Sequence, residues 1–531
     1  MKFLAGLVFF VIVTLPMSHA EQPFLSNSGV VRSAPATRVF RFRLRDEPET
    51  LDWHRAHTAV ETDILMNIME GLVTFNSDLK IVPALAESWS ISQDGKTYLF
   101  KLRRGVQWSD GVVLRAQDFV YSWKRLLSPL TAAPYYNFLF DVEGAQAFSE
   151  GKLLDFSQVG VKALDDSTLQ VKLTQPVAHW IYIPAFWVTF PMRKDIVDKY
   201  GSGWETPGRM VNLGPYSLAS HDLDSKIVLK ANPHYYGNKG NVEEIQAWIL
   251  KDDTAALTLF EAGQLDFLTD LGAVDQKKLV GRSDLKILPH LKTSFLGFVV
   301  QKYPVSRVKL RQAFAMALDR VKLNRLLQGN QPAASSFVPP GMTAYSQTMG
   351  LPYNPERARS ELAMAGYGPG NPLTLDFLLP NWDKAQVIGE FIKSELKKNL
   401  SVEINLQSFD NKAYLMQLGL HSSPLFYKTW TADYPDPDNF MSLFLSTSGN
   451  SETTWKNDTF DQKIQAARLS QNEREREKIY QDMQKLLIEQ EAVMIPLYYE
   501  PNLALMKARV QNVELNRLDY LYLRKVNVVS P

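Results

Sequence analysis

The residues best suited to hold a small charged ligand are Trp430 and Asp433, near the end of an apolar run. The run, residues 424–427, is typical of a buried strand, and Pro435 and Pro437 prevent the strand from continuing. Trp430 offers a flat apolar wall, and a carboxylate beside it would bind an ammonium group through a charge-assisted hydrogen bond. The pattern predicts a strand that leads into a rigid acidic turn carrying a cation-binding carboxylate.

Two further acids, Asp436 and Asp438, follow in the same turn. Acids in Asp-Pro-Asp runs usually bond their own backbone, so we interpret these two side chains as turn chemistry. Asp433 is therefore the candidate binding residue of this segment.

The sequence contains none of the short signatures of common catalytic sites. No stretch has the glycine-lysine pattern of a phosphate loop, the paired histidines of a metalloprotease or a glycine-flanked nucleophilic serine. His54 and His57 stand three residues apart without a third ligand nearby, which is typical of an ordinary loop. We therefore expect no cofactor, no metal and no enzymatic activity. Paired carboxylates are not recognisable from spacing, so a secreted hydrolase acting on a peptide or glycan is the alternative.

The first twenty residues are typical of a cleaved signal peptide. Lys2 is followed by an apolar core, residues 3–15, and by the small-x-small site Ser18-His19-Ala20. The core has about 13 residues, fewer than the roughly 20 that span a membrane. The chain has no cysteine, which excludes both a lipid-modified cysteine and a disulfide. We expect cleavage after Ala20 and a periplasmic protein that is not a lipoprotein.

Charge and size restrict the partners and the architecture. Without residues 1–20 the chain loses one basic residue, which leaves 57 basic and 57 acidic residues. A net charge of zero gives no electrostatic reason to bind nucleic acid or anionic lipid. The length, with 45% hydrophobic residues, is sufficient for two or three domains.

The elements around the acidic turn alternate between strand and helix. Residues 39–44 alternate as a strand, and a helical pattern over 387–396 precedes a strand pattern over 402–406. Apolar residues from Leu310 to Val321 predict one helix that starts near Val308 and ends near Gly329. This alternation predicts an α/β lobe.

Several segments together resemble a known family. They are LAESW at 85–89, DGKTY at 94–98, WSDG at 108–111, RQAFA at 311–315 and the strand and turn at 429–440. In this order they resemble the periplasmic oligopeptide-binding proteins of peptide ABC transporters, which belong to solute-binding protein family 5. That family also includes receptors for dipeptides, murein peptides, nickel chelates and some glycans, so the resemblance leaves a non-peptide ligand open.

The resemblance implies an α/β fold with mixed sheets, a two-lobed periplasmic-binding-protein clamshell of the large, three-domain type II variety. Domain I would comprise residues 21–70, 190–295 and 497–531, domain II residues 71–189 and domain III residues 296–496. The implied function is that of a monomeric receptor that captures peptides between its lobes and delivers them to an inner-membrane ABC permease. In the family a peptide lies as an added strand.

The resemblance also implies site residues. Asp433 matches the carboxylate that binds the peptide α-amino group, and Thr429 and Thr431 match the main-chain pairing positions. Trp430 and Tyr135 match aromatic residues of the ligand pockets.

Other positions match the family less well. His57 and Ala59 fall where the first lobe offers its backbone to the peptide. Tyr427 and Leu418 stand where oligopeptide receptors carry arginines for the ligand carboxylate, and Ala385 replaces a histidine used for longer ligands. The amino end of the ligand is therefore expected to be recognised in the family's way, and the carboxyl end is not.

Overall fold

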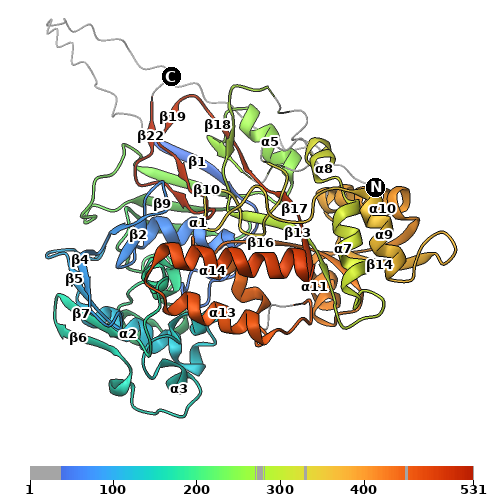
Figure 1. Cartoon of the computed structure of the whole chain (residues 1–531). Helices are drawn as coiled ribbons and strands as arrows, with labels where there is room; N and C mark the ends of the chain where they lie inside the picture. The colour runs from blue at the N-terminus through green and yellow to red at the C-terminus, as the bar shows by residue number, and fades with distance from the viewer. Residues whose placement is uncertain are drawn as a thin grey trace, which may run out of the picture. The chain divides into compact units, whose positions relative to one another are not determined.

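Three sheets and the helices around them account for most of the chain, as Figure 1 shows. The computed structural model describes residues 38–529 except 270, 272–278, 280, 328–331 and 449–451. The expected signal peptide, residues 1–20, and the end of the expected helix at Gly329 lie outside the described residues. The predicted α/β class with mixed sheets is confirmed, since the first and third sheets each combine parallel and antiparallel pairs.

The first sheet has seven strands in the order β12-β18-β11-β1-β10-β9-β8. β1 forms where alternation predicts it, because its inward side chains Phe40 and Phe42 enter the core. It pairs in parallel with β10 over its full length. The bounds are Val39–Leu44 (β1), Tyr216–Asp222 (β8), Lys226–Ala231 (β9), Glu244–Ile249 (β10), Phe267–Leu268 (β11), Leu285–Leu288 (β12) and Asn502–Met506 (β18).

The second sheet has four antiparallel strands in the order β4-β5-β7-β6. Helix α2 contacts β6 and β7, and its side chains Phe119, Trp123 and Leu126 are fully buried at helical spacing. The bounds are Ala86–Ile91 (β4), Thr97–Leu102 (β5), Val161–Asp165 (β6), Thr168–Lys172 (β7) and Ala116–Leu127 (α2).

The third sheet carries the acidic turn and has five strands in the order β15-β14-β16-β13-β17. Helices α9 and α10 contact each other, and α10 also lies against β14 and β15. The bounds are Lys292–Phe298 (β13), Leu373–Pro380 (β14), Val402–Phe409 (β15), Leu425–Thr431 (β16), Met494–Tyr499 (β17), Pro355–Met364 (α9) and Asp383–Leu400 (α10).

The single helix predicted from Val308 is wrong in its extent. The structure has two helices, α7 over Val308–Ala317 and α8 over Arg320–Leu326. The carboxylate of Asp319 accepts a hydrogen bond from the backbone N–H of Lys322 and thereby caps a new helix where the pattern continues. Val321 is exposed as a result and does not extend the apolar face of α7.

Two helices after the acidic turn, α13 (Asp458–Leu469) and α14 (Glu473–Lys485), lie side by side (Figure 1). The C-terminal tail forms two short strands, β21 (Leu521–Tyr522) and β22 (Asn527–Val528). Smaller elements include α1 (Ala59–Ile68), α3 (Ala145–Ser149), α4 (Lys194–Tyr200), α5 (Asp253–Glu261), α11 (Asn411–Gly419), α12 (Asp438–Met441), β2 (Val73–Phe75), β3 (Ile81–Pro83), β19 (Val510–Gln511) and β20 (Glu514–Leu515).

Each of the three expected domains corresponds to one sheet. Domain I supplies the strands of the first sheet, domain II those of the second, and domain III most of those of the third. β13 begins at Lys292 and β17 ends at Tyr499, so the third sheet extends a few residues past both boundaries of the segment 296–496. The division into three domains stays a prediction. In the part of the chain that the structure describes, no helix is both long and apolar enough to cross a membrane.

Candidate functional site

Strand β16 is open along one edge near the acidic turn. Its other edge pairs with β13 over the whole strand, from Leu425 opposite Phe298 to Thr431 opposite Lys292. On the open side, β14 pairs only with Leu425 and Phe426. Among the described residues, no strand therefore pairs with positions 429–431 on that side.

The backbone groups of Thr429 and Thr431 point toward this open edge. The N–H of Ala432 donates to the carbonyl of Leu291 on the β13 side at 2.9 Å. Because successive backbone groups of a strand alternate between its two edges, those of Thr431 and Thr429 face away from β13. An extended ligand could therefore pair with both residues.

Tyr414 limits the length of the open edge. The carbonyl of Tyr427, the next group on that edge, accepts a hydrogen bond from the Tyr414 hydroxyl, and both side chains are buried. The main-chain groups available to a ligand therefore lie between Lys428 and the acidic turn. This length suits a short peptide.

Asp433 lies just beyond β16 and is held by Asn439. The Asn439 amide donates to a carboxylate oxygen of Asp433 at 3.0 Å, and its carbonyl oxygen accepts the Asp433 N–H at 3.2 Å. The same oxygen accepts the indole N–H of Trp430 at 2.9 Å, so one side chain fixes both candidate residues. Burial raises the pKa of Asp433 to about 6, against the opposing hydrogen bond from Asn439.

No positively charged side chain pairs with Asp433 among the described residues. Its neighbours Asp436 and Asp438, in contrast, are buried and bind Arg476 and Arg468 at 2.8 and 2.7 Å. Burial alone would raise the pKa of Asp438, but His179 and Arg468 outweigh it and hold this pKa well below its usual range. Only Asp433 of the three acids is available for a ligand cation.

The turn chemistry predicted for the other two acids is present at Asp436 and wrong for Asp438. Among the described residues, the Asp438 carboxylate accepts hydrogen bonds only from side chains, those of Tyr434, Arg468 and Tyr480. The carboxylate of Asp436 accepts the backbone N–H of Asp438 at 3.0 Å, as Asp-Pro-Asp runs usually do. Sequence reasoning missed the two arginine partners, because Arg468 and Arg476 stand 30 and 40 positions further along the chain. Arg476 stands in a run of alternating charges, residues 473–478, and nothing in this local pattern indicates that its side chain is partly buried against the turn.

Asp433 and Trp430 line a cavity of about 940 Å³, which we call the aromatic cavity. Tyr135, from a distant part of the sequence, lines it as well, and its ring makes edge contacts with Phe138, Phe186 and Trp187 at 5.1 to 5.7 Å. Three predicted site residues thus meet at one cavity. The lining of this cavity also includes Phe138, Asp141, His179 and Arg468.

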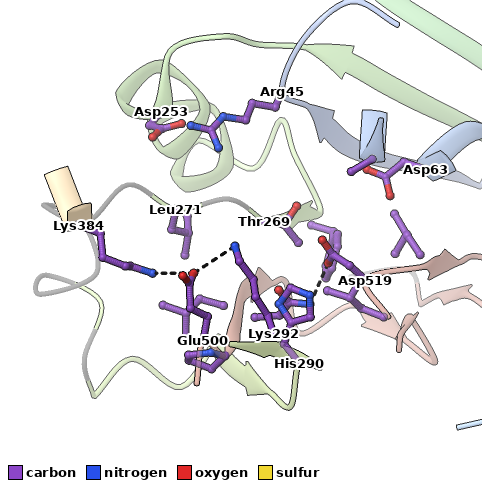
Figure 2. Close-up of a pocket in the computed structure, with 17 residues that line it drawn as sticks. Arg45, Asp63, Asp253, Thr269, Leu271, His290, Lys292, Lys384, Glu500 and Asp519 are labelled. Atoms are coloured by element: carbon purple, nitrogen blue, oxygen red, sulfur yellow. Dashed lines mark hydrogen bonds and ion pairs between the residues drawn. The ribbon is translucent and has the colours of Figure 1, made fainter. Parts of the chain in front are cut away.

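A second cavity of about 220 Å³, the lysine cavity, lies beside the start of β13 (Figure 2). Lys292 and Lys384 approach the Glu500 carboxylate from two sides at 3.2 and 3.4 Å, and Ser294 donates to it at 2.6 Å. Burial opposes ionisation of Glu500, but the two lysines outweigh it and hold its pKa well below the usual range.

His57 and Ala59 do not join the aromatic cavity. Ala59, the first residue of α1, is exposed and lines the lysine cavity. His57 is exposed, with its Nδ1 atom 3.4 Å from the carbonyl of Arg55. His54 is buried and contacts Ser122 instead, so the two histidines do not converge.

The positions expected to lack a carboxylate anchor are buried. Tyr427, Leu418 and Ala385 are each at most 4% exposed. Lys428, the basic residue on the same strand, binds Glu452 at 2.5 Å. None of these side chains is placed as a free cation at the open edge.

The chain matches a known protein family. Residues 80–452 match the family described as bacterial extracellular solute-binding proteins, family 5 Middle. The chain is 31% identical over 506 residues to the probable deoxycholate-binding periplasmic protein YgiS of Escherichia coli strain K12. The aligned region covers 92% of this chain and 94% of that relative.

Solved structures give the same result. The Escherichia coli murein tripeptide binding protein MppA superposes with a TM-score of 0.80 at 29% identity, over 94% of this chain and 99% of that one. The Haemophilus influenzae OppA complex with the peptide RPPGFSPFR superposes with a TM-score of 0.78 at 26% identity, over 94% and 100%.

The fold and the position of the site define a class, the two-lobed periplasmic binding proteins, as expected. Within that class, the chain belongs to family 5 of the bacterial extracellular solute-binding proteins. The resemblance drawn from the sequence is thereby confirmed, and the relatives named above are binding proteins.

Proposed function

We propose that this chain is a periplasmic receptor for short peptides, with the ligand amino terminus at Asp433 and its main chain along the open edge of β16. The observation that carries the proposal is the Asp433 carboxylate, which stands without a cationic partner among the described residues. An ionised acid that is removed from water and lacks such a partner destabilises the folded protein until a cation binds. The adjacent free edge supplies main-chain pairing.

The relatives MppA and OppA support a peptide ligand. MppA is named a murein tripeptide binding protein, and OppA of Haemophilus influenzae is named an oligopeptide-binding protein. YgiS is named for deoxycholate, an anion, and an anion would meet the uncompensated Asp433 carboxylate unfavourably. Deoxycholate is therefore the second candidate, and a thermal-shift titration with it tests this alternative directly.

The wider proposal follows the family. The receptor hands its ligand to an inner-membrane ABC permease, acts as a monomer without catalysis, and has the three domains set out above. It leaves the cytoplasm through a signal peptide cleaved after Ala20 and carries no lipid anchor. Incubation with a mixed peptide pool, followed by mass spectrometry, should yield no cleavage products, whereas products would favour the secreted hydrolase.

The decisive test is calorimetry of tri-alanine binding to the wild type and to Asp433→Asn. Asparagine keeps the shape and removes the charge, leaving the ligand ammonium without its counter-charge. Breaking a desolvated ion pair costs about 3–5 kcal/mol, so the affinity should fall roughly a hundred-fold or more. The matched control is Glu143→Gln, which removes an exposed carboxylate outside the aromatic cavity and should leave binding unchanged.

An acetylated tri-alanine completes the cycle. It should bind the wild type poorly and lose little more on Asp433→Asn, because its amine is already neutral, and this non-additivity is the sign of a direct contact. If Asp433→Asn binds tri-alanine as well as the wild type does, the amine-binding role is wrong.

A further inference from the structure

The two faces of β16 lead to different cavities. Trp430 points to one face and lines the aromatic cavity. Thr429 and Thr431 point to the other, which we call the threonine face, because successive side chains of a strand alternate. On this face Thr431 lies opposite Lys292 of β13. Thr429 lies opposite Ser294 in the same way. The lysine cavity, which Lys292 lines, therefore begins on the threonine face.

Lys384 reaches the same face from the open side of β16. It is the second residue of α10, which follows β14, the strand on the open side. Its Nζ atom lies 3.4 Å from the carboxylate of Glu500, which follows β17 on the other side of β13 (Figure 2). Ser294 of the threonine face donates to the same carboxylate. The Lys384 side chain therefore extends across the threonine face, from the open edge toward β17.

The positive charge of Lys384 is only partly offset. Among the described residues, Glu500 is the one acid that pairs with Lys384, and it binds Lys292 at the shorter distance of 3.2 Å. One carboxylate thus serves two ammonium groups. The side chain of Lys384 is 25% exposed, so an anionic group of a ligand can reach it.

The other acids of the lysine cavity do not surround Lys384. The remaining charged groups of its lining are Arg45, Asp63, Asp253 and Asp519. Asp253 is bound to Arg43 at 2.7 Å, and Asp519 accepts a hydrogen bond from the Asn502 amide at 2.8 Å. Asp63 and Lys384 lie on opposite sides of the cavity in Figure 2. The part of the cavity nearest the open edge is therefore its lysine side.

We infer that the lysine cavity, with Lys384 as its principal cation, is a subsite for an acidic side chain of the bound peptide. This inference rests on the proposed function, because it places the peptide main chain along the open edge of β16. A peptide that continues the pleat of the sheet sends alternate side chains to its two faces. One side chain then enters the aromatic cavity, and the next meets Lys384.

The chemistry and size of the cavity suit a short acidic side chain. The ammonium of Lys384 donates to a carboxylate in a charge-assisted hydrogen bond, which is about twice as strong as a bond to a neutral acceptor. The lysine cavity has a volume of about 220 Å³, against about 940 Å³ for the aromatic cavity. The terminal carboxylate of the peptide is a different group, because it continues the line of the main chain and does not project onto the face.

The test is calorimetry at pH 7.5 with tri-alanine and six analogues that carry glutamate or glutamine at position one, two or three. Glutamine keeps the shape and lacks the charge, and the terminal carboxylate is the same in both. On the wild type, glutamate should bind about ten-fold or more tighter than glutamine at one position. Lys384→Met should reduce this ratio to about two-fold or less, and Lys384→Arg should retain part of it.

The matched control is Lys398→Met, in the last turn of the same helix. Lys398 is exposed and lies outside the lining of the lysine cavity, so the variant should keep the wild-type ratio. Thermal unfolding of Lys384→Met close to that of the wild type shows that a lost preference is not a folding defect. If Lys384→Met does not fold, Lys384→Gln, which can still donate to Glu500, takes its place with the same expected ratio.

The outcomes separate this inference from the proposed function. If tri-alanine binds and depends on Asp433, but no position prefers glutamate or the preference survives the loss of the Lys384 charge, the subsite is wrong and the receptor stands. If no peptide of the set binds, both are wrong.

Discussion

At the scale of single residues, Asp433 is an acid whose ionised form is costly until a ligand arrives. Burial raises its pKa to about 6, from an ordinary value of 3.8. An acid with a raised pKa in the folded state lowers stability once it ionises. Binding sites often carry such costs, which a functional ligand then relieves.

Asp433→Asn should therefore stabilise the ligand-free protein. Ionised Asp433 is favoured in the unfolded chain above pH 3.8 and in the folded chain only above about 6, so the wild type loses stability as pH rises through this window. The shift corresponds to about 3 kcal/mol, and partial exposure reduces this to about 1–2 kcal/mol. Urea unfolding should show the mutant more stable at pH 7.5, with a smaller difference at pH 4.

A mutant that is less stable than the wild type at pH 7.5 would contradict this prediction. Asp433 would then act as a structural cap of the turn, with Asn439 as its partner.

The same pKa predicts the pH dependence of binding. Below about pH 6 the ligand-free carboxylate is protonated and no longer attracts an ammonium, so the affinity for tri-alanine should fall as pH drops from 7 to 5. Asp433→Asn should show no such decline over this range. Calorimetry at pH 7, 6 and 5 measures it, and a wild-type affinity that is flat over these values would contradict it.

At the carboxyl end of the ligand, amidation should change the affinity less than about three-fold. Tyr427, Leu418 and Ala385 are buried, and Lys428 is bound to Glu452. A partner worth ten-fold in affinity needs about 1.4 kcal/mol, which none of these positions supplies. Calorimetry compares tri-alanine with its amide.

A ten-fold loss on amidation would show that a basic anchor exists elsewhere. Lys384 in the lysine cavity would be the first residue to change, because its contact with Glu500 is 3.4 Å long. Loss of the amidation effect in Lys384→Met would then place the anchor there.

At the scale of elements, the acidic turn depends on the two helices that follow it. α13 supplies Arg468 to Asp438, and α14 supplies Arg476 to Asp436. Tyr434 and Tyr480 add hydroxyls toward Asp438 at 3.1 and 3.4 Å. These contacts fix the segment that carries Asp433, so the two helices position the candidate site.

Arg468→Met should destabilise the protein by about 3–5 kcal/mol, because it leaves Asp438 charged and fully buried without its principal partner. Urea unfolding at pH 7.5 measures the loss. The control Arg474→Met removes an exposed arginine of α14 and should change the free energy of unfolding by about 0.5 kcal/mol or less. Equal effects of the two changes would show that the buried pair contributes no special stability.

At the scale of the whole molecule, the short apolar segment, the Ser18-His19-Ala20 site and the absence of cysteine predict a monomer released by cleavage of a signal peptide. The protein recovered from the periplasm should begin at Glu21, with the intact mass of residues 21–531. Light scattering after size exclusion should give one copy per particle. Retention of Met1–Ala20, or a stable dimer, would contradict the prediction.

The sequence by itself was sufficient wherever the signal is local. A short apolar run and the proline positions predicted the strand that ends beside Asp433, and the family motifs predicted the fold class, since each is a pattern of neighbouring residues. The same local reasoning failed at Asp319, where a capping carboxylate interrupts a pattern that otherwise continues.

The tertiary structure alone decided which distant residues meet. The open edge of β16 exists because β14 diverges after Phe426, and Tyr414 closes it by reaching Tyr427. Tyr135, from a segment far away in the sequence, lines one cavity with Asp433 only because the two segments pack together. Burial and the presence or absence of a counter-charge are properties of that packing, and they distinguish an acid that binds a ligand from one that holds a turn.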